Sequence, residues 1–434
     1  MESISKTYKR RGSNISIPKE TIEWIVLTIL LIFSFINSIT LLLFLLSLLL
    51  FLRQKEIGAL KIINIITLRT IINPGIAVNI GEWQNLKWLI MFLCAFYLLK
   101  SYSKTQEIYR KKIKGIVRLV LLFTVYNVIA SFWFSTLPTV AIFKLLSYVV
   151  IFMSVLIGIG YTHNKIDWLK WMLKIFVLFM SISIPMISMS LGYLRTGSSF
   201  QGLSNHPNMF GLLAALFVGI LLTCVQTKRI NNYFLVILLS SITIYMVVLS
   251  KSRTAFITCV VLFLMYTFFI NINRYIKVMI INMVTITMIV ILVSDNFILS
   301  SILDILYKGN TDIFSSRQEQ IGGLVANFLR NPLFGNGFAV PVTPFRTYSF
   351  SSDYIVEPGN LIIAVLSYSG ITGFILFSSY IYKMFWTNIR EFKFVGFLPV
   401  SVLIINMGEM VFFSSNNIGV WIYMFWAIYV FDTR

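Results

Sequence analysis

The chain has 434 residues, of which 58% are hydrophobic and only 12% are charged. A soluble domain usually devotes about a quarter of its residues to charged side chains, so this composition excludes a protein whose whole surface faces water. The formal net charge of +20 does not indicate nucleic-acid binding, because no compact polar domain is present to offer a groove. The apolar runs are long and continuous, whereas membrane β-strands alternate in hydropathy. The sequence therefore predicts an all-α integral membrane protein.

The amino-terminal part allows two topologies. Residues 1–20 are polar and basic and are expected to form a cytoplasmic tail. The apolar run 21–52 is either one tilted helix or a hairpin that turns at Asn37-Ser38, and the run 57–80 is a poor span because it contains Lys61, Arg69 and Pro74. One long helix, with 53–85 along the outer surface, gives about 12 spans and is preferred, whereas a hairpin gives about 14.

Further spans follow in a regular series, and clusters of Lys and Arg fall in alternate connections. Cytoplasmic loops of membrane proteins are enriched in Lys and Arg, so both termini are expected in the cytoplasm of a multi-pass inner-membrane protein. Residues 21–294 are predicted to form a transmembrane bundle and 360–434 the last transmembrane helices. The spans are predicted near 86–99, 116–137, 142–160, 168–191, 209–226, 233–250, 254–271, 275–294, 360–380, 395–413 and 418–431.

Residues 295–359 form the one long polar segment, which the alternation places on the outer face. Loops longer than about 12–15 residues are uncommon unless they carry function, so this segment is expected to be an extracytoplasmic catalytic loop. Within it, 313–330 has the spacing of an amphipathic helix, with Ile321, Leu324, Val325 and Phe328 on one face. Asn331-Pro332 should end that helix, and 334–337 should form a turn.

Cations at the outer mouth of the bundle are the first candidates for chemistry. Arg253 begins a helix after Ser252, where it either extends to the interface or binds phosphate through its forked donors. Arg317, at the start of the amphipathic helix, suits an anion for the same reason, although an arginine in water is the commoner case. Arg195 is a weaker candidate of the same kind.

Polar residues beside the arginines add further candidates. His206 either forms part of a helix-capping turn, in which Asn208 is one candidate cap, or contacts a substrate. Glu357 is either a solvated loop carboxylate or a general base. Glu409 lies inside an apolar run, where an ionisable side chain is usually functional or paired. The sequence has neither a phosphate-binding GxxxxGK[ST] loop nor a metal-binding set of His and Cys, so no metal and no cofactor are expected.

The order of several motifs resembles the O-antigen polymerase and O-antigen ligase family of bacterial envelope glycan assembly. The likeness covers about residues 115–430. The residues that carry it are Gly202-Leu203-Ser204-Asn205-His206-Pro207-Asn208, Ser252-Arg253-Thr254, Ser316-Arg317-Gln318-Glu319, Asn331-Pro332-Leu333-Phe334-Gly335-Asn336-Gly337-Phe338, Asn360-Leu361 and Gly370-Ile371-Thr372-Gly373.

The resemblance implies a metal-independent membrane glycosyltransferase that acts on undecaprenyl-diphosphate-linked sugars at the outer leaflet. It implies Arg253 and Arg317 as diphosphate ligands and Glu357 as the base, with His206, Asn208, Arg195 and Asn360 as further substrate contacts. Ligases of this family usually have His-Asn where this chain has Gly359-Asn360.

This departure favours a polymerase of O-antigen, capsule or exopolysaccharide repeat units over a ligase. A flippase or transporter for lipid-linked oligosaccharides is the alternative outside the family, although such proteins usually show internal repeats. The expected partners are membrane lipids, the lipid-linked oligosaccharide, a chain-length regulator and a flippase.

Overall fold

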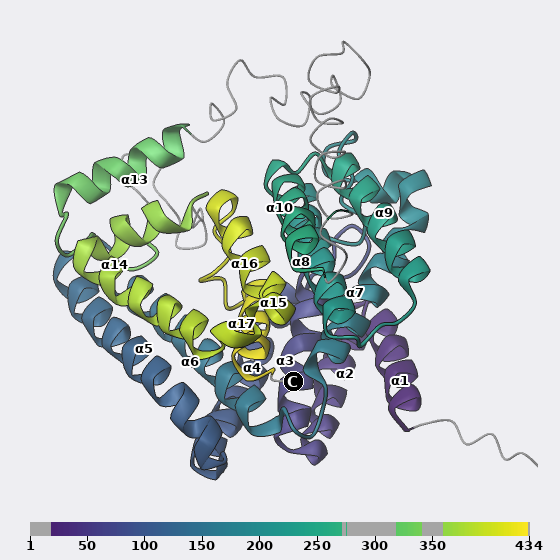
Figure 1. Cartoon of the computed structure of the whole chain (residues 1–434), viewed down its shortest axis with the longest axis horizontal. Helices are drawn as coiled ribbons and strands as arrows, with labels where there is room; N and C mark the ends of the chain where they lie inside the picture. Colours follow the sequence, from purple (N-terminus) through teal and green to yellow (C-terminus); the bar gives the residue numbers. More distant parts are fainter. Residues whose placement is uncertain (1–18, 271–274, 276–317, 341–358, 433–434) are drawn as a thin grey trace, which may run out of the picture.

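The computed structural model describes residues 19–270, 275, 318–340 and 359–432, and these residues form a bundle of helices (Figure 1). Short 3-10 turns connect several of the α-helices. The α-helices are α1 Lys19–Phe33, α2 Ser38–Leu48, α3 Glu56–Thr70, α4 Gln84–Lys100, α5 Glu107–Phe134, α6 Pro138–Thr162, α7 Trp168–Ser183, α8 Pro207–Gln226, α9 Tyr233–Ser250, α10 Arg253–Phe269, α13 Gln318–Arg330, α14 Leu361–Thr387, α15 Phe392–Val395, α16 Phe397–Gly408 and α17 Gly419–Phe431.

The distribution of apolar side chains is that of a membrane protein. Trp133 is 73% exposed and Phe234 is 76% exposed on the outside of the bundle, which costs little where lipid surrounds the helices. All residues of α17 are buried, and α8 is buried along nearly its whole length. These two helices are enclosed by their neighbours, and the prediction of an all-α integral membrane protein is confirmed.

Fewer helices meet the length and composition of a membrane span than the sequence predicts. Among the described residues, seven helices are long and apolar enough to cross a membrane, or eight if 389–395 and 397–408, which meet at a bend of 80°, count as one. The expected span at 275–294 lies outside the described residues. The count of about 12 therefore stays a prediction.

The amino-terminal part differs from the preferred topology, because 21–52 is a hairpin and not one helix. Asn37 caps α2: its side chain accepts a hydrogen bond from the Thr40 N–H at 2.9 Å, and the Thr40 hydroxyl accepts one from the Asn37 N–H at 3.1 Å. This reciprocal cap begins a new helix. The turn at Asn37-Ser38, which the sequence left as the alternative, is the one observed.

The expectation that 53–85 lies along the surface is wrong for α3, which is almost entirely buried. Its charged side chains have partners inside the bundle. Lys61 binds Glu23 of α1 and the Gln54 side chain, and Arg69 donates to the Ser34 hydroxyl at 2.9 Å. Buried charges are tolerated when they are paired. The run that forms α3 looks too polar for a membrane span, yet it packs in the interior of the bundle for this reason.

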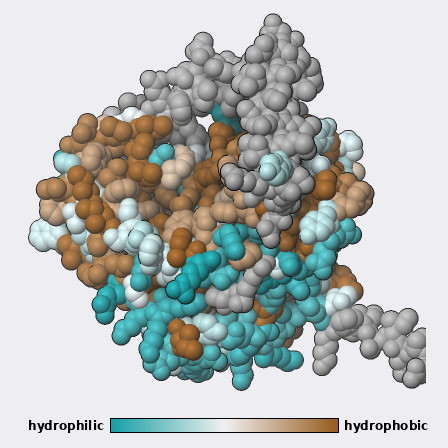
Figure 2. Space-filling model, viewed as in Figure 1, coloured by the Kyte–Doolittle hydropathy of each residue, from teal (hydrophilic) through white to brown (hydrophobic). Residues whose placement is uncertain are grey.

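The helices end at two chemically different faces of the bundle. One face, which we call the basic end, carries Lys100, Lys111, Lys170, Lys228 and Arg390 at or beside helix ends. Hydrophilic side chains cover the lower part of the molecule in Figure 2, where the carboxyl terminus also lies in Figure 1. At the opposite face, which we call the mouth, α8, α10 and α14 begin and α16 ends.

The amphipathic helix predicted at 313–330 is confirmed as α13 over the described residues 318–330, and it ends before Asn331 as expected. Leu324 is buried and Ile321 and Phe328 are half-buried, whereas Val325 is 40% exposed and Asn327 lies inward instead. The helix lies across the first half of α14 (Figure 1). Its apolar face is thus one residue narrower than the sequence predicts.

Candidate functional site

Three helix N-termini surround the last turn of α16 at the mouth. From α8, the Asn208 amide donates to the Glu409 carboxylate, with 3.0 Å between Nδ2 and Oε1. From the residue before α14, the Asn360 amide donates to the Met407 carbonyl at 3.2 Å. The start of α10 packs on Gly408, where a methyl group would overlap the Thr254 side chain. We call this set of Asn208, Arg253, Asn360 and Glu409 the mouth cluster.

Each member of the mouth cluster is fixed by the way its helix begins or ends. The Asn360 side chain caps α14 by accepting a hydrogen bond from the Ile363 N–H at 3.1 Å. Ser252 precedes Arg253, which is the first residue of α10. Glu409 follows the last residue of α16 and donates its own N–H to the Ile405 carbonyl at 2.8 Å. The backbone that carries these side chains is therefore held by the hydrogen bonds of the helix ends.

Close packing of α8 on α10 sets the distance between the two helix starts. Gly211 of α8 lies against Ser252, and a methyl group on Gly211 would overlap the serine side chain. Because only glycine admits this approach, the first turns of α8 and α10 lie next to each other. Their N-termini carry the positive ends of two helix dipoles. Arg253, the first residue of α10, adds a positive charge at this end of the bundle, and helix N-termini together with an arginine suit a phosphate group.

The predicted substrate contact His206 caps α8, as the alternative interpretation held. Its Nδ1 accepts a hydrogen bond from the Asn208 N–H at 3.0 Å, and Pro207 occupies the first helical position. The helix thus begins before Met209, and the histidine itself is the capping residue. Asn208 does not cap the helix, because its amide is directed to Glu409.

The other predicted site residues separate into two groups. Arg195 is exposed, and its backbone N–H donates to the Gln201 side chain at 3.0 Å. Among the described residues, no hydrogen bond or ion pair joins its guanidinium to the mouth cluster. Arg317 and Glu357, the second diphosphate ligand and the base, lie outside the described residues. From the predicted set, the structure therefore brings Asn208, Asn360 and the first turn of α10, which carries Arg253, to the end of α16.

Glu409 is the member of the mouth cluster that the sequence singled out without placing it in a site. Its signal was an ionisable side chain in an apolar run. Asn208, its partner, is 201 residues away in the sequence, so the pairing depends on the fold and not on any local pattern.

The motif Asn331–Phe338 locks α13 to α14. The Ile371 N–H donates to the Pro332 carbonyl at 2.8 Å, and the Gly337 N–H donates to the Tyr368 carbonyl at 3.1 Å. These bonds are available because α14 is broken at Gly370, which has φ 62° and ψ −170°. The motif therefore holds α13, which precedes it, against the first part of α14.

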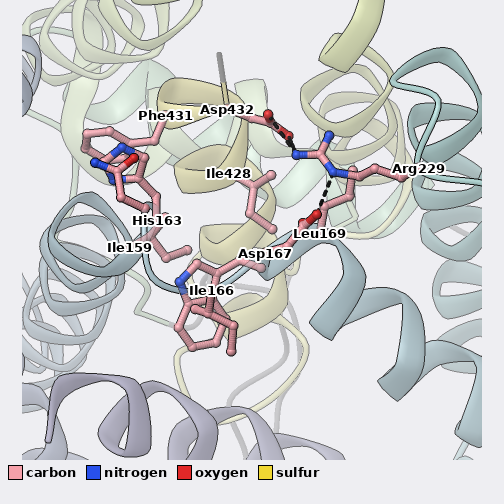
Figure 3. A pocket seen from close by; sticks show the side chains of 11 residues that line it. Ile159, His163, Ile166, Asp167, Leu169, Arg229, Ile428, Phe431 and Asp432 are labelled. Carbon is pink, nitrogen blue, oxygen red and sulfur yellow. Dashed lines mark hydrogen bonds and ion pairs between the residues drawn. The ribbon is translucent and has the colours of Figure 1, made fainter. Parts of the chain in front are cut away.

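A second polar cluster lies at the basic end and is shown in Figure 3. The Arg229 Nε donates to the Asp167 carboxylate at 2.8 Å, and Nη2 binds the Asp432 carboxylate at 3.0 Å. A cavity of about 150 Å³ lies beside them, and His163 is among the residues that line it. Arg229 thus joins the α8–α9 connection to the start of α7 and the end of α17.

Burial and charge act against each other in this cluster. Burial raises the pKa of the Asp432 carboxyl above its ordinary value, and Arg229 opposes that rise. Burial lowers the pKa of the Arg229 guanidinium, but the two carboxylates outweigh it and the net shift of that pKa is upward. The arginine compensates the carboxylates, so the cluster acts as an ionic clamp between helix ends.

Replacing Arg229 with glutamine is expected to lower the free energy of unfolding by about 1–3 kcal/mol, because two half-buried carboxylates lose their cation. The unfolding temperature of the purified protein in detergent measures this. Burial raises the pKa of Asp432, so this carboxyl binds a proton more readily in the folded state than in the unfolded state. The loss of stability caused by Arg229→Gln should therefore become smaller as the pH falls. Arg390→Gln, at an exposed arginine of the same face, should leave the temperature unchanged. An equal loss in both variants would contradict the clamp.

Among the described residues, no group of three or more His, Cys, Asp or Glu side chains is arranged to hold a metal ion. The comparison with protein families matches residues 234–378 to the O-antigen ligase family. The matched range includes α9, α10, α13 and the broken first part of α14. No curated protein matches the chain. The family match is consistent with the resemblance that the motifs carry, and residues 234–378, about a third of the chain, are similar to the O-antigen ligase family.

Proposed function

We propose that this protein is a membrane glycosyltransferase that polymerises undecaprenyl-diphosphate-linked oligosaccharide units of O-antigen, capsule or exopolysaccharide. The observation that carries the proposal is the mouth cluster, where Arg253 and the N-termini of α8, α10 and α14 meet. A diphosphate is the ligand that such a set of donors favours. The family match over 234–378 includes Arg253, and the similarity to O-antigen ligases supports a glycan as the substrate.

In the proposed reaction, a hydroxyl oxygen of the acceptor glycan attacks the anomeric carbon of the donor. The bond between that carbon and the diphosphate oxygen breaks, and the electron pair leaves with the undecaprenyl diphosphate. Arg253 and Arg317 stabilise the negative charge that develops on the leaving group. Glu357 takes the hydroxyl proton. Balanced in this way, the transfer needs no metal and no cofactor.

The remaining predicted residues complete the proposed substrate site. Asn208 and Asn360 belong to the mouth cluster and offer amides to sugar hydroxyls. His206 orders the turn from which Asn208 projects. Arg195 is exposed and carries a positive charge. We propose all four as substrate contacts.

The basic end is proposed to face the cytoplasm of a bacterium, with the mouth at the outer leaflet of the inner membrane, because Lys and Arg concentrate in cytoplasmic connections. The amino-terminal and carboxyl-terminal ends are then both cytoplasmic. A flippase would deliver the lipid-linked unit to the mouth, and a chain-length regulator would act with the polymerase.

The lipid-linked glycans of a deletion strain test the proposed function against its rivals. Loss of a polymerase is expected to leave single oligosaccharide units on undecaprenyl diphosphate at the outer leaflet. Loss of a ligase would leave long chains on the same lipid, and loss of a flippase would retain single units at the inner leaflet. Complementation with the intact gene should restore long chains. Long chains that persist on the lipid in the deletion strain would replace the polymerase by a ligase.

A further inference from the structure

Glu409 is a carboxylate carried beside the proposed diphosphate site. It follows Gly408, and Gly408 packs directly on Thr254, the residue next to Arg253. The side chain is half-buried at the mouth. Its position at the carboxyl end of α16 is electrostatically unfavourable for a negative charge, because the carbonyl groups there carry the negative end of the helix dipole.

The orientation of this carboxylate is fixed from α8. The Asn208 amide donates to Oε1 at 3.0 Å, and the backbone N–H of Asn208 is held by the His206 ring at 3.0 Å. A chain of hydrogen bonds thus runs from the cap of α8 to the carboxylate. The motif His206-Pro207-Asn208 therefore has the geometry to orient Glu409.

A carboxylate at this place divides the mouth into two parts of opposite charge. A diphosphate is attracted to Arg253 and repelled by Glu409. The part of the substrate next to Glu409 must therefore be uncharged and rich in hydrogen-bond donors. Sugar hydroxyls meet this requirement, because an ionised carboxylate accepts several hydrogen bonds and binds donors more strongly than a neutral group does.

We propose that Glu409, oriented by Asn208, binds hydroxyl groups of the acceptor sugar and holds the acceptor beside the donor diphosphate on Arg253. This inference rests on the proposed glycosyl transfer. It assigns donor and acceptor to different residues of the mouth cluster: the diphosphate to Arg253 and the acceptor hydroxyls to Glu409.

The test compares glycan synthesis with donor-lipid binding in full-length variants. Glu409→Gln keeps the length of the side chain and an oxygen for the Asn208 amide, and it removes only the charge. Long-chain glycan in complemented cells should fall at least about tenfold, while the purified variant binds undecaprenyl diphosphate as the wild type does, measured by native mass spectrometry. Glu82→Gln, which alters an exposed carboxylate at the same end of the bundle, should change neither quantity.

The outcomes separate this inference from the proposed function. If Glu409→Gln makes normal glycan, the charge of Glu409 has no part in acceptor binding and the inference is overturned, while the polymerase assignment is untouched. If the variant loses undecaprenyl diphosphate binding together with glycan, the carboxylate belongs to the donor site and the division of roles is wrong. If Arg253→Ala binds undecaprenyl diphosphate normally, the proposed diphosphate site itself fails. Asn208→Ala should give a smaller loss of glycan than Glu409→Gln.

Discussion

Replacing Arg253 with alanine is expected to abolish long glycan chains in a complemented deletion strain. The guanidinium is the charged donor of the mouth cluster, and removal of one donor that stabilises a developing anion commonly costs about 100- to 1,000-fold in rate. Arg253→Lys keeps the charge and loses the forked geometry, so it should retain part of the activity. Chain length is read from the ladder of glycan on a gel, with the protein level in the membrane measured in parallel.

Lys251 gives a matched control for this experiment. It is an exposed cation two residues before Arg253, in the turn between α9 and α10. Lys251→Ala removes the same charge from the same connection without touching the first turn of α10, so its glycan ladder should match that of the wild type. A wild-type ladder from Arg253→Ala would remove this residue from the site. An equal loss in both variants would reduce its role to general surface charge.

Alanine at Gly335 or Gly370 is expected to disrupt the packing of α13 on α14. Gly335 has φ +75°, and Gly370 lies in a backbone region that is almost restricted to glycine. A methyl group on Gly335 would overlap the backbone of Tyr368 and Ser369, and one on Gly370 would overlap the backbone of Leu333. Strain and overlap together are expected to cost about 2–5 kcal/mol of stability. The unfolding temperature of the purified variants measures the loss.

Gly322 serves as the control for both glycine variants. It lies on α13, and a methyl group there would meet no heavy atom within 4 Å. Because alanine favours helix more than glycine by about 1 kcal/mol, Gly322→Ala should keep or raise the unfolding temperature. If Gly335→Ala and Gly370→Ala unfold at the wild-type temperature, the lock between the motif and the broken helix contributes nothing to stability.

Much of the architecture follows from hydropathy alone, because each apolar run must satisfy its backbone within a helix. The amino-terminal hairpin was harder to predict. Its cap pairs Asn37 with Thr40, whereas the commoner signature has Glu or Gln at the third position. The burial of α3 depends on Lys61 meeting Glu23 and on Arg69 meeting Ser34. No local pattern reveals such long-range pairing.

The site was predicted in part for a related reason. Arg253 and Asn360 stand at helix starts, where short motifs give a readable signal. The bond between Asn208 and Glu409 joins α8 to the end of α16, so the role of each depends on a partner far along the chain. The break of α14 at Gly370 could not be predicted, because it lies inside an apolar run and depends on residues 332–333, which bond to the backbone that the break exposes.

Single-cysteine labelling tests most directly whether the mouth faces the side on which lipid-linked glycan is displayed. The native cysteines Cys94, Cys224 and Cys259 are buried, so an introduced cysteine dominates the reaction with a membrane-impermeant maleimide. Lys251→Cys reports on the connection before Arg253, and Lys111→Cys reports on the basic end. Labelling of the Lys251 position in intact cells, and of the Lys111 position only after the inner membrane is opened, is the result expected. The reverse pattern would place Arg253 in the cytoplasm and contradict a polymerase that acts at the outer leaflet.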